Sequence, residues 1–287
     1  MRMLSIFALS LATATVLGAG AASANVIVGN TTLPSYSDGA LKISFDDHET
    51  LVNPGPTPPP INLLLQGTGI IKSISGGINQ TYGNAASVTS TGLNGLFGST
   101  HILTDVFTGF TFRTSITAGG NTTLFFTGGT FNIYQLPGSN VPNTSISPAA
   151  ATLAQAIANA SAGTLFLQLT PQVQDSFGDT FITTINNTVF SNFTLAQGVA
   201  YLSATGGIAK NYFDTNTVSN SYLNQVADLQ FGGRAQTTGC PNLANGLKVC
   251  GSDDAFNVQV PEPFTLSLFG AGLAGAAAIR RRKAKKA

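Results

Sequence analysis

Residues 105–136 read DVFTGFTFRTSITAGGNTTLFFTGGTFNIYQL and give the clearest indication of the fold class. Its β-branched and aromatic runs are divided by glycine and asparagine, a pattern that is typical of strands separated by turns. Alternation is clearest where Val106, Phe110 and Phe112 stand among threonine and glycine. We therefore expect strands with one buried and one solvated face.

The same signal recurs along most of the chain and predicts a mainly β protein. About ten short strands with glycine-rich turns favour a sandwich or a jelly roll. Alternating βαβ units are absent, which argues against a nucleotide-binding α/β fold. The expected strands lie at Asn62–Leu65, Gly69–Ile74, Asp105–Ile116, Thr122–Phe126, Thr130–Leu136, Thr164–Leu169, Thr188–Leu195, Ala200–Ala204, Ala227–Gly232 and Ala255–Val260.

One short helix is expected over the alanine-rich segment Pro148–Ala162. Ser147 is placed to cap it, Pro148 falls at the first helical position, and Gly163 follows its last residue. Residues 53–60 hold five prolines and form either a spacer or an ordered loop.

Charge is scarce and unevenly distributed. Charged residues make up 9% of the chain, against about 25% in an average soluble domain. A surface built from Thr, Ser, Asn and Gly instead is typical of exported β-rich proteins. Residues 25–260 hold six basic and eleven acidic residues, a net charge of about −5, so they lack the basic surface that nucleic acid requires.

The N-terminal segment has the features of a signal peptide, which we assign to residues 1–24. Arg2 supplies the positive region, and a mostly apolar run follows. Ala22 and Ala24 satisfy the small-residue rule for signal peptidase, so cleavage is expected before Asn25. The apolar run is too short for a membrane-spanning helix.

The C-terminal segment, residues 260–287, has three parts. Val260, Pro261, Glu262 and Pro263 precede an uncharged stretch at 264–279, which is marginal in length for a single transmembrane helix. A basic cluster follows, of the kind that stays cytoplasmic: Arg280, Arg281, Arg282 and Lys283.

This three-part order resembles the PEP-CTERM sorting signal. The resemblance implies that a membrane-embedded exosortase recognises Pro261, Glu262 and Pro263, with the basic cluster as a stop signal. It also implies a transient stay in the inner membrane and then a location at the cell surface or outside the cell. Residues 25–259 would be the exported β-rich domain.

A second resemblance lies in GGIAKNYFDTN at residues 206–216, followed by Ala-Asp-Leu-Gln-Phe at residues 227–231. Together with the sorting tail, these segments are similar to the flocculation-associated PEP-CTERM proteins. That family implies a role in cell aggregation through exopolysaccharide.

The two cysteines, Cys240 and Cys250, are expected to form a disulfide, because the chain is exported. Closing a loop of this size contributes roughly 2–3 kcal/mol. Two thiolates without further ligands nearby do not predict a zinc site.

Catalytic motifs are missing from the sequence. His48 lies in Asp-Asp-His-Glu at residues 46–49, which we interpret as a polar loop. We interpret His101 as a surface turn residue. No G-x-S-x-G elbow occurs. Asp175 with Asp179, and Asp253 with Asp254, offer oxygen ligands for calcium but no calcium-loop pattern.

We therefore expect no catalytic residue, no metal and no cofactor. The expected partners are exosortase, extracellular polysaccharide or neighbouring cell surfaces, and transiently the membrane. The expected function is a non-enzymatic part in biofilm or floc formation. The alternative is an exported carbohydrate-active enzyme or carbohydrate-binding module, since paired carboxylates suffice for glycoside hydrolysis.

Overall fold

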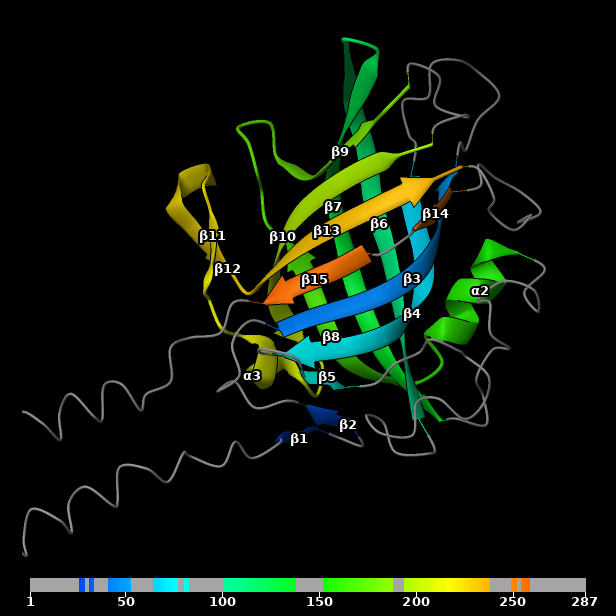
Figure 1. Cartoon of the computed structure of the whole chain (residues 1–287), viewed down its shortest axis with the longest axis vertical. Helices are drawn as coiled ribbons and strands as arrows, with labels where there is room; N and C mark the ends of the chain where they lie inside the picture. Colours follow the sequence, from blue (N-terminus) through cyan, green and yellow to red (C-terminus); the bar gives the residue numbers. More distant parts are fainter. Residues whose placement is uncertain are drawn as a thin grey trace, which may run out of the picture.

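The computed structural model describes residues 26–28, 31–33, 41–52, 64–76, 80–82, 101–137, 152–187, 194–237, 249–251 and 254–258 (Figure 1). Strands dominate these residues. They are β1 (Val26–Val28), β2 (Thr31–Leu33), β3 (Leu41–Val52), β4 (Leu64–Gly76), β5 (Gln80–Tyr82), β6 (His101–Ala118), β7 (Asn121–Pro137), β8 (Thr164–Pro171), β9 (Asp179–Ile185), β10 (Ala196–Gly206), β11 (Val218–Asn220), β12 (Gln225–Ala227), β13 (Leu229–Gln236), β14 (Val249–Gly251) and β15 (Asp254–Val258). The helices are α2 (Leu153–Ala160), α3 (Lys210–Phe213) and the 3-10 turn η3 (Tyr222–Asn224).

The main sheet closes on itself. Its antiparallel neighbours run β13-β15-β3-β4-β6-β7-β8-β10, and β10 pairs with β13 to complete the ring. Two shorter strands fill the remaining gaps, because β9 pairs with both β7 and β10, and β14 pairs with both β13 and β3. The mainly β prediction is confirmed, but the architecture is a barrel, not a sandwich or jelly roll. A closed ring leaves fewer unpaired strand edges.

Residues 105–136 lie in the longest described hairpin, which β6 and β7 form. The two expected strands at 122–126 and 130–136 are one continuous strand in the structure. Gly119 and Gly120 turn the chain between Ala118 and Asn121, with φ of +58° and +83°. A two-residue turn with positive φ at both positions matches the twist of the flanking strands and favours glycine.

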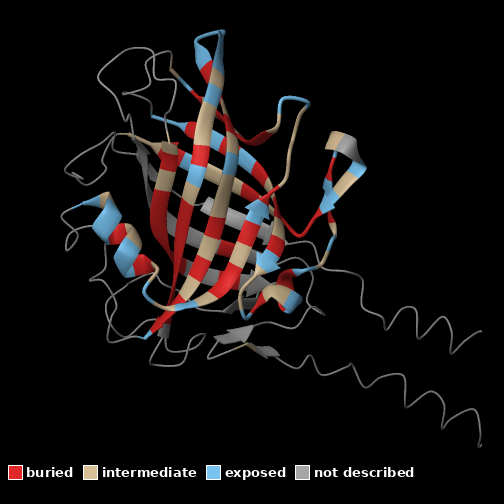
Figure 2. Ribbon diagram, turned by 180° about the vertical axis from the view of Figure 1, so that it is seen from behind, coloured by how far each residue is buried: buried red, intermediate tan, exposed pale blue. Residues whose placement is uncertain are grey.

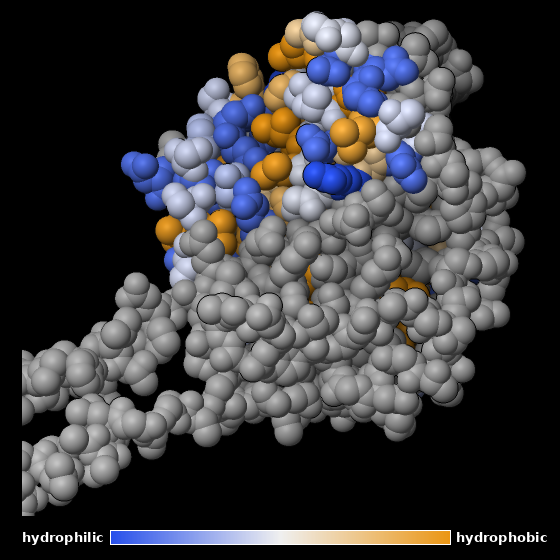
Figure 3. Space-filling view, in the orientation of Figure 1, coloured by the Kyte–Doolittle hydropathy of each residue, from blue (hydrophilic) through white to orange (hydrophobic). Residues whose placement is uncertain are grey.

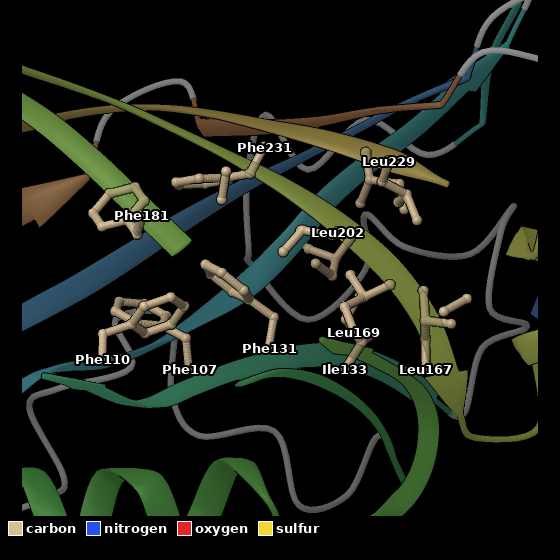
Figure 4. Close-up of a cluster of buried hydrophobic side chains, with 14 of the residues drawn as sticks. Phe107, Phe110, Phe131, Ile133, Leu167, Leu169, Phe181, Leu202, Leu229 and Phe231 are labelled. Carbon is tan, nitrogen blue, oxygen red and sulfur yellow. The ribbon is translucent and has the colours of Figure 1, made fainter. Parts of the chain in front are cut away.

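Apolar side chains fill the barrel interior. Buried and less buried residues alternate along the strands (Figure 2), as in β10, where every second residue from Ala196 to Ala204 is buried. Rings from unpaired strands meet across the interior: Phe131 of β7 lies 5.2 Å from Phe231 of β13, and Phe110 of β6 lies 5.7 Å from Phe181 of β9 (Figure 4). The core is therefore a packed aromatic cluster.

Helix α2 packs outside the barrel against β4 and β6. The helix prediction is confirmed over 153–160, but the cap is Thr152, whose Oγ1 accepts from the Gln155 N–H at 3.2 Å. Ser147 and Pro148, the expected cap and first turn, lie outside the described residues and before this cap. Gly163 is needed for close packing, because a Cβ there would lie 2.2 Å from the Gln135 carbonyl oxygen.

Several strands were not anticipated from the sequence. The Asp-Asp-His-Glu segment at 46–49 lies inside β3, so the polar-loop interpretation was wrong. His101 begins β6 and is not a turn residue. In the expected strand at 188–195, only 194–195 are described, and they are not in a strand. The proline-rich segment 53–60 lies outside the described residues.

Candidate functional site

The last described strand completes the barrel. In β15, Phe256 pairs with Phe231 of β13 on one side and with Ile43 of β3 on the other. Val258 pairs in the same way with Leu229 and Leu41. The barrel wall therefore ends at Val258, two residues before the C-terminal segment at 260–287.

A charged and aromatic cluster lies on the outer wall, where the connection between β8 and β9 folds back. Arg113 of β6 donates through Nε to Asp179 Oδ1 at 2.6 Å and through Nη2 to Oδ2. Asp179 is fully buried, whereas the Arg113 side chain is 30% exposed. The guanidinium also lies 4.8 Å from the ring centre of Phe177 and 5.6 Å from that of Phe125, within cation–π range.

Asp175 organises the turn that carries Phe177. Its Oδ1 accepts from the N–H groups of Phe177 at 2.9 Å and Asp179 at 3.0 Å. Burial, the largest single influence, raises the pKa of Asp175, but those hydrogen bonds and the charge of Arg113 outweigh it and lower the pKa. The hydrogen bond with Asp179 raises the pKa of Arg113, which stays protonated. The sequence offered Asp175 and Asp179 as oxygen ligands for calcium. In the structure both carboxylates bind Arg113 instead.

An apolar band continues from this cluster across the wall. Phe125 pairs in register with Ile182 of β9, and Ile182 pairs with Val199 of β10. Phe177 is 70% exposed and Val199 is 37% exposed. We call Phe177, Phe125, Ile182 and Val199 the apolar band.

A second polar cluster anchors the segment that resembles flocculation-associated proteins. Asp228 is buried, and its carboxylate accepts from the N–H of Ala204 at 2.7 Å and of Asn216 at 2.6 Å. Thr215 also donates to the Asp228 backbone carbonyl at 3.4 Å. Asp228 therefore anchors residues 207–227 to the barrel. We call this segment, which leaves the barrel wall between β10 and β13, the excursion.

The hairpin of β11 and β12 within that excursion has its own anchor. The buried Asn220 donates to Gln172 Oε1 at 3.2 Å and to the Val173 carbonyl at 3.1 Å. Gln172 in turn donates to Ser203 and to the Val226 carbonyl. These bonds fix a hairpin that projects from the barrel (Figure 1).

Four described carboxylates make structural contacts. Asp175 and Asp179 hold Arg113, Asp228 accepts from backbone N–H groups, and Asp214 accepts from the Asn216 side chain. Asp105 is fully buried in the wall of β6. Among the residues that the structure describes, no three His, Cys, Asp or Glu residues are grouped to hold a metal ion. The sequence did not reveal these clusters, because Arg113 and Asp179 are 66 positions apart.

Other expected site residues fall largely outside the described ranges. These are Ala22, Ala24, Asn25, Cys240, Val260, Pro261, Glu262, Pro263, Arg280, Arg281, Arg282 and Lys283. Cys250 lies in β14, where its backbone pairs with Gln236 and His48. Within the described part, no helix is long and apolar enough to cross a membrane; the expected span at 264–279 lies outside it.

The family model of the PEP-CTERM protein-sorting motif matches residues 259–283. The chain carries a PEP-CTERM sorting signal. No curated protein and no solved structure matches the chain.

The PEP-CTERM match begins immediately after the closing strand β15. It confirms the resemblance drawn from Val260, Pro261, Glu262 and Pro263 and from the basic cluster. A chain with this signal is exported, sorted by exosortase and directed to the cell surface. The barrel ends at Val258, so all of its strands precede the sorting signal.

Proposed function

We propose that this PEP-CTERM chain is a non-enzymatic surface or matrix protein that contributes to exopolysaccharide-associated biofilm or floc formation. The observation that carries the proposal is the junction at Val258, where the barrel is complete and the sorting signal begins. Removal of the signal leaves every strand of the barrel in place. This junction supports a domain that acts after the sorting signal has been removed.

The composition of the barrel supports a role without catalysis. Its interior is occupied by packed rings, and the carboxylates of Asp175, Asp179 and Asp228 hold Arg113 or backbone groups. Its outer wall carries hydroxyl and amide side chains, among them the bonded pairs Thr123 with Thr184 and Thr170 with Thr205. Many weak contacts from such a wall reach useful strength when many copies act together.

Deletion of the gene in its host tests the proposal. We expect cell aggregation to fall while polysaccharide output is unchanged, and a chain with intact signal to restore aggregation. A chain in which Pro261, Glu262 and Pro263 are replaced by alanine is the matched control, and it should fail to restore aggregation. Unchanged aggregation with lost polymer degradation would favour the carbohydrate-active enzyme instead.

A further inference from the structure

Phe177 is exposed and yet held firmly in place. Its ring is 70% exposed, while Arg113 contacts it at 4.8 Å and the Asp175 carboxylate fixes its backbone N–H. The preceding Gln174 donates to the carbonyl oxygens of Thr180 at 2.7 Å and Val199 at 3.1 Å. The ion pair of Arg113 with the buried Asp179, together with the hydrogen bonds of the Asp175 and Gln174 side chains, thus presents one phenylalanine ring to solvent.

Such preorganisation favours binding at this position. A ring that is already ordered loses little conformational freedom when a ligand stacks on it, so more of the contact energy appears as affinity. Exposed apolar side chains scattered singly need no explanation, but a contiguous band does. The apolar band extends from Phe177 past Phe125 and Ile182 to Val199.

The surroundings of the band are polar and nearly neutral. Thr123, Thr184 and Gln197 occupy the neighbouring row of the same strands. Arg113 is paired with two carboxylates, so the cluster carries a charge of about −1 and repels anionic ligands. Figure 3 shows one face of the molecule, on whose described part apolar and hydrophilic residues are intermixed.

We propose that the apolar band binds a neutral polysaccharide, with the pyranose rings stacked on Phe177 and their hydroxyl groups bonded to the adjacent Thr and Gln side chains. This inference rests on the proposed function and names its ligand class. The band's four side chains are far fewer than the roughly 20–30 residues a side of a stable protein interface. A single sugar chain, in contrast, presents an apolar ring face flanked by hydroxyl groups, which a narrow apolar strip with Thr and Gln side chains beside it can match.

The test measures retardation of the processed protein, purified after export from an exosortase-bearing host, in gels containing dextran, mannan, hydroxyethyl cellulose or alginate. We expect binding to at least one neutral polymer and none to alginate. Phe177→Ala should weaken binding about five- to tenfold, the loss of one stacking contact. Phe177→Trp should retain or strengthen it, which separates the ring's role from damage to the loop.

Val226→Ala is the matched control, because Val226 is 49% exposed and lies outside the apolar band. It should bind like the wild type. Equal binding by Phe177→Ala and the wild type, binding to alginate alone, or no binding to any neutral polymer overturns the inference. A deletion strain that loses aggregation, with Phe177→Ala fully restoring it, would refute this site and leave the proposed function standing.

Discussion

Replacing Asp179 with asparagine removes the buried half of the ion pair that fastens the connection between β8 and β9. The carboxylate is fully buried and accepts two bonds from Arg113. An asparagine retains one acceptor, but its amide nitrogen faces a guanidinium N–H, so one of the two bonds becomes a repulsive contact.

The expected loss follows from these contacts. A hydrogen bond to a charged group contributes about 1.5–3 kcal/mol, and removing one partner of a fully buried pair costs about 3–5 kcal/mol. Arg113 is 30% exposed and regains water, so we expect Asp179→Asn to lower the free energy of unfolding by about 2–3 kcal/mol. For a domain of this size, Tm would fall by roughly 4–12 °C.

Urea unfolding at pH 7, followed by near-UV circular dichroism, measures this loss. Asp214→Asn is the matched control, because it makes the same chemical change at an exposed carboxylate. It should change stability by less than about 0.5 kcal/mol. If Asp179→Asn unfolds at the same urea concentration as this control, the ion pair does not hold the connection between β8 and β9.

Three further predictions concern other contacts. The pKa of Asp175 is lowered in the folded state, so the stabilisation by its carboxylate is present above the unfolded pKa of about 3.9 and disappears as pH falls through the folded pKa. The difference in unfolding free energy between the wild type and Asp175→Asn should therefore shrink on acidification. A constant difference from pH 6 to pH 2 in urea titrations would contradict this. Asp228→Asn should cost about 2–4 kcal/mol and speed amide hydrogen exchange mainly within 207–227, whereas unchanged exchange there would show that Asp228 does not anchor the excursion. Gly163→Ala should cost about 1–3 kcal/mol by overpacking against Gln135, and thermal stability equal to the wild type would argue against that close approach.

The alternating pattern of 105–136 predicted strands correctly because buried and exposed residues follow each other locally. Closure of the ring was not predictable in the same way, since it depends on β10 meeting β13 and on β3 meeting β15. These partners lie far apart in sequence and carry no shared motif. A sandwich and a barrel produce the same alternation, so the sequence alone did not separate them.

Other errors have identifiable causes. Four consecutive polar residues at 46–49 concealed β3, because strand formation there comes from pairing with β4 rather than from apolar alternation. β9 was overlooked because DTFITTI places Phe181 beside Ile182 and Thr183 beside Thr184, so its residue types show little alternation, although burial does alternate from Phe181 to Ile185. The apolar band and the Arg113 ion pair are created only when β6, β7, β9 and β10 meet.

Mass spectrometry of the processed protein, recovered from the cell surface or the medium, locates both ends of the exported chain. We expect a chain that begins at Asn25, includes all of β15 through Val258, and lacks the basic cluster at 280–283. Recovery of the polypeptide from the cytosol with Met1 and Ala287 both present would contradict export and sorting. A C-terminus upstream of Val258 would contradict the claim that a complete barrel is what the sorting signal delivers.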